Sequence, residues 1–353
     1  MRGTTASKWI RSERVLRLVC LSLFILTITT EAAPELRRFE AVEPHMGTLA
    51  RVTVYTATEE SARAAFRAAF DRIATLDRIL SDYRADSELN RLTKVAVTRP
   101  TRVSEDLFVV LQSAQKLAEA TDGAFDITLG PIIGLWREAR RQQRMPDPAS
   151  LREAASRSGF RKLHLDAEHR TAMVDSPHMA LDVGAIGKGY AASEAVAALT
   201  RAGVKSALVA LSGDLAFSHA PPGQRGWRIG IYPGDAPARN VPERVELTNA
   251  AVSTSGSSEQ HLDVDGRRYS HIIDPSSGVG VTEDLTVTVI APHGMDADGL
   301  DTAVSVLGVQ RGIALIESRP DVAALILQHT ANGTRVFTSS RFPIASVAFQ
   351  APR

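Results

Sequence analysis

The stretch MALDVGAIGKGYAASEAVAALTRAG, residues 179–203, joins an apolar run to a glycine-rich segment and then to an alanine-rich one. This order predicts a strand, a tight turn and a helix. Glycines at 184, 187 and 189 allow the backbone to approach a ligand closely. The first N–H groups of the helix are suited to hold phosphate, and Lys188 adds a positive charge there.

A purely structural explanation of this turn is equally open. In it the glycines only shape a strand-to-helix connection, and Lys188 is solvated. The segment is not a Walker loop, because Gly189 rather than Ser or Thr follows the lysine. Its glycine spacing also differs from the dinucleotide-binding fingerprint.

The segments on both sides mix helices and strands without strict alternation, which favours an α+β fold: one two-lobed domain of mixed sheets and helices. Helices are expected over 59–83, 105–121, 131–142, 147–158 and from 296 to 308. Strands are expected over 36–57, 162–165, 170–174, 205–217, 226–234 and 284–292, with a strand broken by small polar residues over 250–260. The last part, 310–338, has the pattern of a helix, a strand and a hairpin.

The N-terminus has the three parts of a secretory signal peptide. Basic residues precede the apolar run LVCLSLFILTI, 18–28, and small residues follow in EAAPE. We therefore expect a signal peptide over 1–33, a mature domain over 34–353, and a periplasmic location. An uncleaved anchor at the inner membrane and a lipid on Cys20 are the alternatives.

Composition narrows the chemistry. Cys20 is the only cysteine, so the mature domain would have no disulfide and no cysteine-bound metal. A bound metal would have oxygen or imidazole ligands, as hard cations do. The net charge of +1 and the aromatic content of 5% give no support to nucleic-acid binding.

An acidic segment, DADGLDTA at 296–303, is the clearest candidate for a cation site. Asp298, Asp301 and Thr302 fall at positions i, i+3 and i+4, so a helix would present them on one face. Two carboxylates and a hydroxyl suit Mg²⁺. Acidic residues also stabilise the first turn of a helix through its dipole, which is the competing explanation.

Four other segments carry residues that could bind or react. In YSHIIDPSSG, 269–278, His271 ends a strand before a rigid turn; a lone histidine there is most often structural. TDGAFDITLGP, 121–131, places Asp126 between a turn and a strand, and SDYRADSELNRL, 81–92, offers Tyr83 for stacking on a ring. STSGSS, 253–258, could line a polar pocket. The chain has no Gly-x-Ser-x-Gly elbow, which argues against a serine hydrolase.

Taken in order, MGT (46–48), SDYRADSELNRL, DGAFDITLGP, DVGAIGKGYAA, LSGDL, STSGS, HIIDPSSG and DADGLDTA resemble the ApbE family, the FAD:protein FMN transferases. The resemblance runs from about residue 40 to 340. It implies Mg²⁺-dependent transfer of the FMN moiety of FAD to a Thr or Ser hydroxyl of a target protein, with release of AMP. From the expected export to the periplasm, we infer that the acceptor would be a membrane electron-transfer subunit.

The resemblance also implies roles for individual residues. The residues at FAD-contact positions are Met46, Tyr83, Ala124, Phe125, Asp126, Asp182, Lys188 and Ile273. The Ala185 carbonyl, Asp298 and Thr302 stand at metal positions, and the helical-face argument adds Asp301. His271 stands where the family has its proposed catalytic base.

The pattern departs from the family after the histidine, where Ser277 and Gly280 replace the usual threonine and proline. Two other functions remain open at this point. One is hydrolysis of FAD to FMN and AMP. The other is flavin binding without turnover, which would require neither His271 nor the acidic segment.

Overall fold

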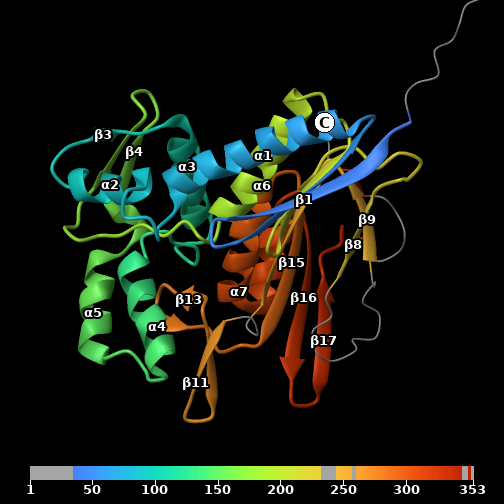
Figure 1. Cartoon of the computed structure of the whole chain (residues 1–353). Helices are drawn as coiled ribbons and strands as arrows, with labels where there is room; N and C mark the ends of the chain where they lie inside the picture. The colour runs from blue at the N-terminus through green and yellow to red at the C-terminus, as the bar shows by residue number, and fades with distance from the viewer. Residues whose placement is uncertain (1–34, 232–243, 257–259, 344–348, 351–353) are drawn as a thin grey trace, which may run out of the picture. The chain divides into compact units, whose positions relative to one another are not determined.

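An eight-stranded antiparallel sheet organises the computed structural model, which describes residues 35–231, 244–256, 260–343 and 349–350 (Figure 1). The spatial order is β1-β2-β6-β7-β10-β15-β16-β17. The strands are β1 (Arg37–His45), β2 (Thr48–Thr56), β6 (Ala207–Leu211), β7 (Asp214–Phe217), β10 (Ala250–Gly256), β15 (Leu285–Ala291), β16 (Ala323–Thr330) and β17 (Gly333–Thr338).

The two faces of this sheet bury different partners. Helices α1 (Glu59–Leu80), α6 (Gly187–Arg201) and α7 (Gly294–Glu317) cover one face. A small sheet of β8 (Trp227–Gly230), β9 (Arg244–Thr248) and β18 (Phe349–Gln350) lies against the other. On β15, Val287 and Val289 point to the helices, whereas Ile290 points to the small sheet, as the period of two in a strand requires. Both faces are therefore apolar.

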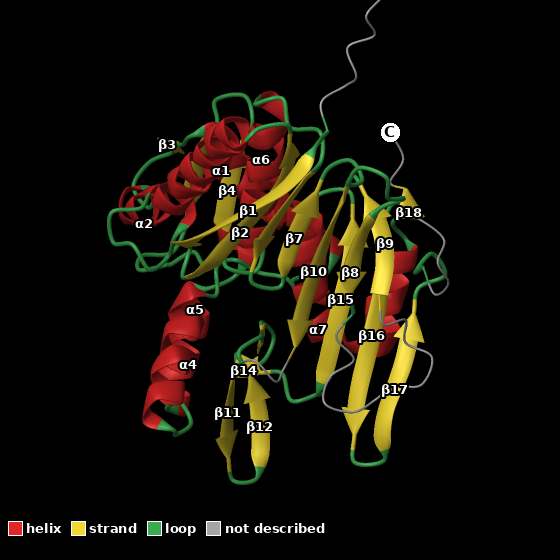
Figure 2. Ribbon diagram, turned by 45° about the vertical axis from the view of Figure 1, so that its right-hand side comes forward, coloured by secondary structure: helices red, strands yellow, loops and turns green. Residues whose placement is uncertain are grey.

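The remaining elements lie beside this core. A separate sheet has three strands: β3 (Thr101–Arg102), β4 (Leu163–Asp166) and β5 (Thr171–Val174). The same part of the chain forms α2 (Glu88–Val95), α3 (Glu105–Ala120) and the short 3-10 helix η1 (Phe160–Lys162). Helices α4 (Gly130–Gln142) and α5 (Pro148–Arg157) form a pair. Next to α4 lie the hairpins β11 (His261–Val264) with β12 (Arg267–Ser270) and β13 (Ile273–Asp274) with β14 (Val279–Gly280) (Figures 1 and 2).

Helix α4 is joined to these hairpins by a separate apolar cluster. Its members include Ile132 and Trp136 from α4, Leu262 from β11 and Ile273 from β13. The indole Nε1 of Trp136 donates to the Gly278 carbonyl at 2.8 Å. This contact fixes the turn between β13 and β14, and with it the segment that carries His271.

Most of the predicted elements are confirmed, including the mixed α+β architecture. Ser87, Ser104 and Asp147 cap α2, α3 and α5 through their side chains, as helix-start signals do. Residues 35–353 form one compact unit. The predicted signal segment, 1–33, with Cys20, lies outside the described residues. Helix α7 is long and apolar enough to span a membrane, but it packs against β10, β15 and α6 as a core helix.

Five predicted features differ from the structure. Residues 36–57 form a hairpin rather than one strand, because Met46 and Gly47 adopt φ of 50° and 72° in a two-residue turn. Residues 205–217 likewise form the hairpin β6–β7, with Ser212 at φ 57°. Such short turns leave the alternation of apolar and polar residues almost intact, so each segment has the sequence pattern of one continuous strand.

Of the other three differences, two concern irregular backbone and one concerns a strand. Residues 179–186 form no strand; the Asp182 N–H donates to the Ile127 carbonyl at 2.8 Å, which ties the segment to a loop. Asp126 also lies in a loop, not at the start of a strand. The predicted break in 250–260 is absent from β10, which runs unbroken over 250–256; residues 257–259 lie outside the described residues.

The first turns of α6 and α7 touch backbone to backbone. A Cβ placed on Gly189 would lie 2.7 Å from the Asp298 Cβ and would overlap the Gly294 carbonyl. A Cβ on Gly294 would in turn overlap the Gly189 carbonyl. The Gly294 N–H also donates to Ser193 Oγ at 2.8 Å. Only glycine fits at both positions of this contact.

We predict that Gly189→Ala and Gly294→Ala each lower the free energy of unfolding by about 1–3 kcal/mol, because the helices must separate. The measurement is urea unfolding followed by circular dichroism. Gly134→Ala in α4 is the matched control, since a Cβ there meets nothing within 4 Å. It should leave stability unchanged or raise it by up to about 1 kcal/mol. Equal stability of all three variants and the wild type would refute the close contact.

Candidate active site

Three buried carboxylates gather where α6, α7 and the sheet meet. Asp298 and Asp301 of α7 are 3% and 2% exposed, and Asp214 at the start of β7 is 2% exposed. The Lys188 ammonium forms an ion pair with Asp214 and lies 3.9 Å from Asp298 Oδ1. The Gly189 N–H donates to Asp298 Oδ2 at 2.9 Å. We call Asp214, Asp298 and Asp301 the carboxylate cluster.

The hydroxyl of Ser253 joins two members of the cluster. Its Oγ lies 2.5 Å from Asp214 Oδ1 and 2.6 Å from Asp301 Oδ2. A serine hydroxyl has one proton and cannot donate to both oxygens. Without a cation, one of the two carboxyl groups must therefore carry a proton.

The electrostatics of the cluster favour a bound cation. Burial, together with the charge of Asp214, raises the pKa of Asp298 to about 7. Burial and the neighbouring carboxylates raise the pKa of Asp301 well above its usual value. Burial alone would lower the pKa of Lys188, but Asp298 and Asp214 outweigh it and hold that pKa above its usual value. One ammonium group cannot balance three carboxylates, so a divalent cation fits the remaining negative charge.

Three of the four predicted metal-binding residues lie together on one helix, and the fourth lies in a turn. Asp298, Asp301 and Thr302 share one face of α7, and Thr302 Oγ1 donates to Asp301 Oδ1 at 3.2 Å. Ala185 lies in the turn just before α6. Within the part of the chain that the structure describes, no group of three or more Asp, Glu, His or Cys side chains surrounds a common point as metal ligands would. A set of two carboxylates, one hydroxyl and one carbonyl does not require such a group.

The ring of His271 is held at one nitrogen, and none of the described residues forms a hydrogen bond with the other. Its backbone N–H and its ring Nδ1 both lie near the Gln260 carbonyl, at 3.0 and 3.1 Å. Because a carbonyl only accepts, Nδ1 carries the proton and Nε2 keeps its lone pair. Burial lowers the pKa of His271, against the Gln260 hydrogen bond, and the charges of Arg140 and Lys188 lower it further. The ring is therefore neutral near pH 7 and can accept a proton.

A second charged group surrounds Arg137 of α4. Its guanidinium donates to Asp82 at 2.5 Å and to the buried Asp182 at 2.7 Å. It also lies 4.4 Å from the centre of the Tyr83 ring, which is 78% exposed. Tyr83 and Asp182, which resemblance assigns to FAD, are thus brought together by an arginine. Burial and Asp82 raise the pKa of Asp182, whereas Arg137 opposes that shift.

The other predicted FAD residues have structural surroundings. Phe125 and Ile273 are buried in apolar clusters, and Met46 occupies the β1–β2 turn. Ala124 is half-buried beside Phe125. The Asp126 carboxylate accepts from the Thr128 N–H at 2.7 Å and from the Phe160 N–H at 2.9 Å. Burial nevertheless raises the pKa of Asp126, despite these hydrogen bonds.

Sequence reasoning missed Asp214, Ser253 and Arg137 as site residues. Asp214 and Ser253 lie opposite each other on β7 and β10. Their segments, LSGDL and STSGS, are evident in the sequence, but only the strand pairing shows that the two residues meet. Arg137 lies in a run of arginines that gives no sign of which one turns inward.

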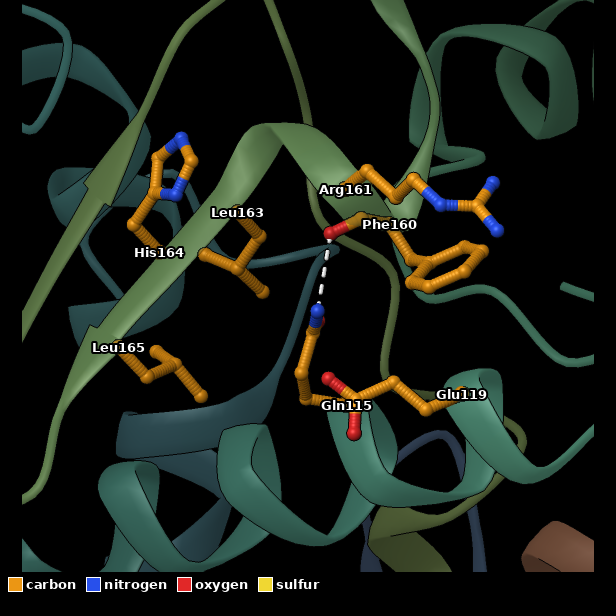
Figure 3. A pocket seen from close by; sticks show the side chains of 7 residues that line it. All are labelled: Gln115, Glu119, Phe160, Arg161, Leu163, His164 and Leu165. Atoms are coloured by element: carbon orange, nitrogen blue, oxygen red, sulfur yellow. Dashed lines mark hydrogen bonds between the residues drawn. The ribbon is translucent and has the colours of Figure 1, made fainter. Parts of the chain in front are cut away.

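A groove elsewhere on the surface is lined by none of the predicted FAD, metal or catalytic residues. It has a volume of about 540 Å³ and is lined by residues of α3, η1 and β4 (Figure 3). Gln115 Nε2 donates to the Phe160 carbonyl at 3.1 Å across it. We assign no chemistry to this groove.

Comparisons with known proteins show the family to which the chain belongs. The ApbE family model matches residues 46–326. The FAD:protein FMN transferase of Salmonella typhimurium is 31% identical over 338 residues, covering 92% of this chain and 96% of that protein. The Treponema pallidum protein of the same name is 34% identical over 309 residues, covering 82% and 84%.

Solved structures give the same result. The flavinyl transferase ApbE of Pseudomonas stutzeri superposes with a TM-score of 0.77 at 30% identity, covering 89% of this chain and 99% of that one. The flavin transferase ApbE of Vibrio cholerae has a TM-score of 0.77 at 28% identity, covering 87% and 98%. With a family match over most of its length and relatives of this similarity, the chain belongs to the ApbE family.

Proposed function

We propose that this chain, a flavin transferase by family, transfers the FMN moiety of FAD to a Thr or Ser hydroxyl of a target protein and releases AMP. The observation that supports this reaction best is His271. Its ring is neutral, and Nδ1 donates its proton to the Gln260 carbonyl. None of the described residues forms a hydrogen bond with Nε2. The charge of Lys188, which lies beside the carboxylate cluster, acts on the ring.

In this mechanism His271 accepts the proton of the acceptor hydroxyl. A threonine or serine hydroxyl is a weak nucleophile until its proton is removed, and a near-neutral imidazole suits that task. The hydroxyl oxygen forms a bond to the phosphorus of the FMN half, and the bond from that phosphorus to the oxygen of AMP breaks. The proton ends on Nε2, and AMP leaves with the bonding electrons.

The carboxylate cluster fits a Mg²⁺ ion held by Asp298, Asp301, Thr302 and the Ala185 carbonyl. When bound, Mg²⁺ would offset the charge that develops on the diphosphate as the bond to AMP breaks. Lys188 neutralises Asp214, and Ser253 fixes the orientation of the Asp214 and Asp301 carboxylates. The carboxylates present negative charge to a cation, and Lys188, which lies beside them, presents positive charge to a phosphate.

The group around Arg137 supplies a surface for the rest of FAD. The exposed Tyr83 ring, backed by the Arg137 guanidinium, offers a face for an aromatic ring. Asp182 is held in one orientation by Arg137 and by the Gly184 N–H at 2.8 Å.

A transfer assay tests the proposal. The purified protein is incubated with FAD and Mg²⁺, with and without a candidate acceptor, and AMP and covalent flavin are measured. The proposal predicts AMP only with acceptor, in equal amount to the flavin attached. AMP released equally without acceptor would indicate FAD hydrolysis, and no AMP in either case would indicate flavin binding only.

We also propose that the protein acts in the periplasm on a membrane electron-transfer subunit. This proposal rests on the signal-like N-terminal sequence. It predicts that the protein from the native host's periplasm begins near Ala33 or Pro34, which mass spectrometry of the intact protein measures. An intact Met1, or a lipid on Cys20, would contradict it.

For the cation site we predict that Asp298→Ala abolishes metal-dependent turnover, whereas excess Mg²⁺ partly rescues Thr302→Ala. A carboxylate supplies charge, but water can replace a neutral hydroxyl in the Mg²⁺ shell. Turnover is measured after chelator treatment and readdition of Mg²⁺. Wild-type activity of Asp298→Ala in this assay would show that the cation lies elsewhere.

For the base we predict that His271→Ala slows FMN transfer by about 10²–10⁴-fold and leaves the FAD dissociation constant nearly unchanged. Burial lowers the pKa of His271, so the ring stays neutral to a lower pH than an exposed histidine would. In the wild type, the loss of kcat/KM that accompanies protonation of the ring should therefore occur at a lower pH than for a histidine of ordinary pKa.

The same measurements distinguish the alternatives. A histidine that only ends a strand would give near-normal turnover in the alanine variant. Equal losses of rate and of FAD affinity would make His271 a binding residue instead of a base.

A further inference from the structure

Arg140 lies in the last turn of α4, on the face directed at the His271 segment. Trp136, four residues earlier, donates to the Gly278 carbonyl, and its ring lies 5.7 Å from that of Tyr269. Side chains four residues apart on a helix lie on the same face. Arg140 therefore continues the side of α4 that packs against the hairpins around His271.

Arg140 differs from its neighbouring arginines in having no counter-ion. Arg137 is bound to Asp82 and Asp182, and Arg141 forms an ion pair with Glu138. Within the described ranges, the Arg140 guanidinium makes no hydrogen bond or ion pair, although its side chain is half-buried. A guanidinium has five N–H donors, and leaving them partly desolvated without an acceptor is unfavourable.

The charges of Arg140 and Lys188 both act on His271. Arg140 and Lys188, which belong to different helices, both lower the pKa of His271. Burial and the nearby Arg137 also lower the pKa of Arg140 itself. Lys188 is balanced by Asp214 and Asp298, whereas Arg140 has no anionic partner among the described residues. The Arg140 guanidinium is therefore available for a ligand that brings negative charge.

A helix dipole does not account for this arrangement. The dipole favours cations in the last turn of a helix, but the exposed Arg141 already meets that preference. It gives no reason to bury Arg140 beside Arg137 and His271. The burial of Arg140 is therefore explained by the proposed active site and not by the helix dipole.

The mechanism places phosphate oxygens within reach of Arg140. His271 removes the proton of a hydroxyl that attacks phosphorus, so the reacting phosphate lies one hydroxyl group away from Nε2. The proposed FAD residues Tyr83 and Asp182 contact Arg137, which lies three residues before Arg140 on α4, and Ile273 belongs to the apolar cluster that α4 forms with the hairpins. The FAD diphosphate would lie between these two sets.

We propose that Arg140 binds an oxygen of the FAD diphosphate. This inference rests on the proposed function and adds a specific residue for recognition of the substrate. The planar guanidinium can donate two parallel hydrogen bonds to phosphate. FAD would supply the acceptor that Arg140 lacks in the protein alone.

The experiment compares Arg140→Ala, Arg140→Lys and the control Arg141→Ala. Dissociation constants for FAD and for riboflavin, which has no phosphate, are measured by calorimetry on variants whose near-ultraviolet circular dichroism matches the wild type. Arg140→Ala should weaken FAD binding by about 10–100-fold and leave riboflavin binding unchanged. Arg140→Lys should restore part of the FAD affinity, and Arg141→Ala should behave as the wild type.

Three results would overturn the proposal. These are an unchanged FAD dissociation constant in Arg140→Ala, an equal loss for FAD and riboflavin, or a rise only in the KM for the acceptor, which would assign Arg140 to an acidic group of the partner. Failure of the transferase function is a separate result, since it appears as wild-type protein that binds FAD but transfers no FMN. The binding comparison still tests Arg140 in that case.

Discussion

The backbone contact between Gly189 and Gly294 is the constraint on which the site depends. It brings the first turns of α6 and α7 together, so that the Gly189 N–H binds the Asp298 carboxylate and Lys188 lies beside it. The same contact leaves Asp298 and Asp301 buried, where each charge is unfavourable without a partner. A cation and a phosphate together would satisfy both the carboxylates and the lysine. In the proposed function, the charges of the carboxylate cluster and of Lys188 are therefore balanced only when both ligands are bound.

The position of His271, the proposed base, depends on a second, independent packing unit. Trp136 of α4 binds the Gly278 carbonyl, and Leu262 and Ile273 complete the apolar cluster beneath the hairpins. Gln260, at the start of this region, fixes the tautomer of His271. Helix α4 also carries Arg137 and Arg140. One helix therefore supports the proposed base, the surface around Tyr83 and Asp182, and an arginine with no ion pair among the described residues. This explains why an arginine-rich helix lies next to a neutral histidine.

Local signals in the sequence predicted much of this structure. Capping residues such as Ser104 and Asp147 marked helix starts, and the spacing of Asp298, Asp301 and Thr302 placed them on one face. Non-local pairing could not be predicted: Asp214 meets Ser253 only because β7 and β10 pair in that register. The two-residue turn at Met46 and Gly47 was missed because it preserves the alternation of the strands. Segment 179–186 is apolar like a strand, but its backbone is bound to a loop instead.

The most direct test of the account is anomalous diffraction from crystals of the protein with FAD and Mn²⁺ in place of Mg²⁺. The account predicts one peak within coordination distance, about 2.0–2.3 Å, of Asp298, Asp301 and Thr302, next to the diphosphate. His271 Nε2 should face the phosphorus of the FMN half, with no protein group bound to it. A cation bound away from the carboxylate cluster, or His271 turned away from the diphosphate, would contradict the account.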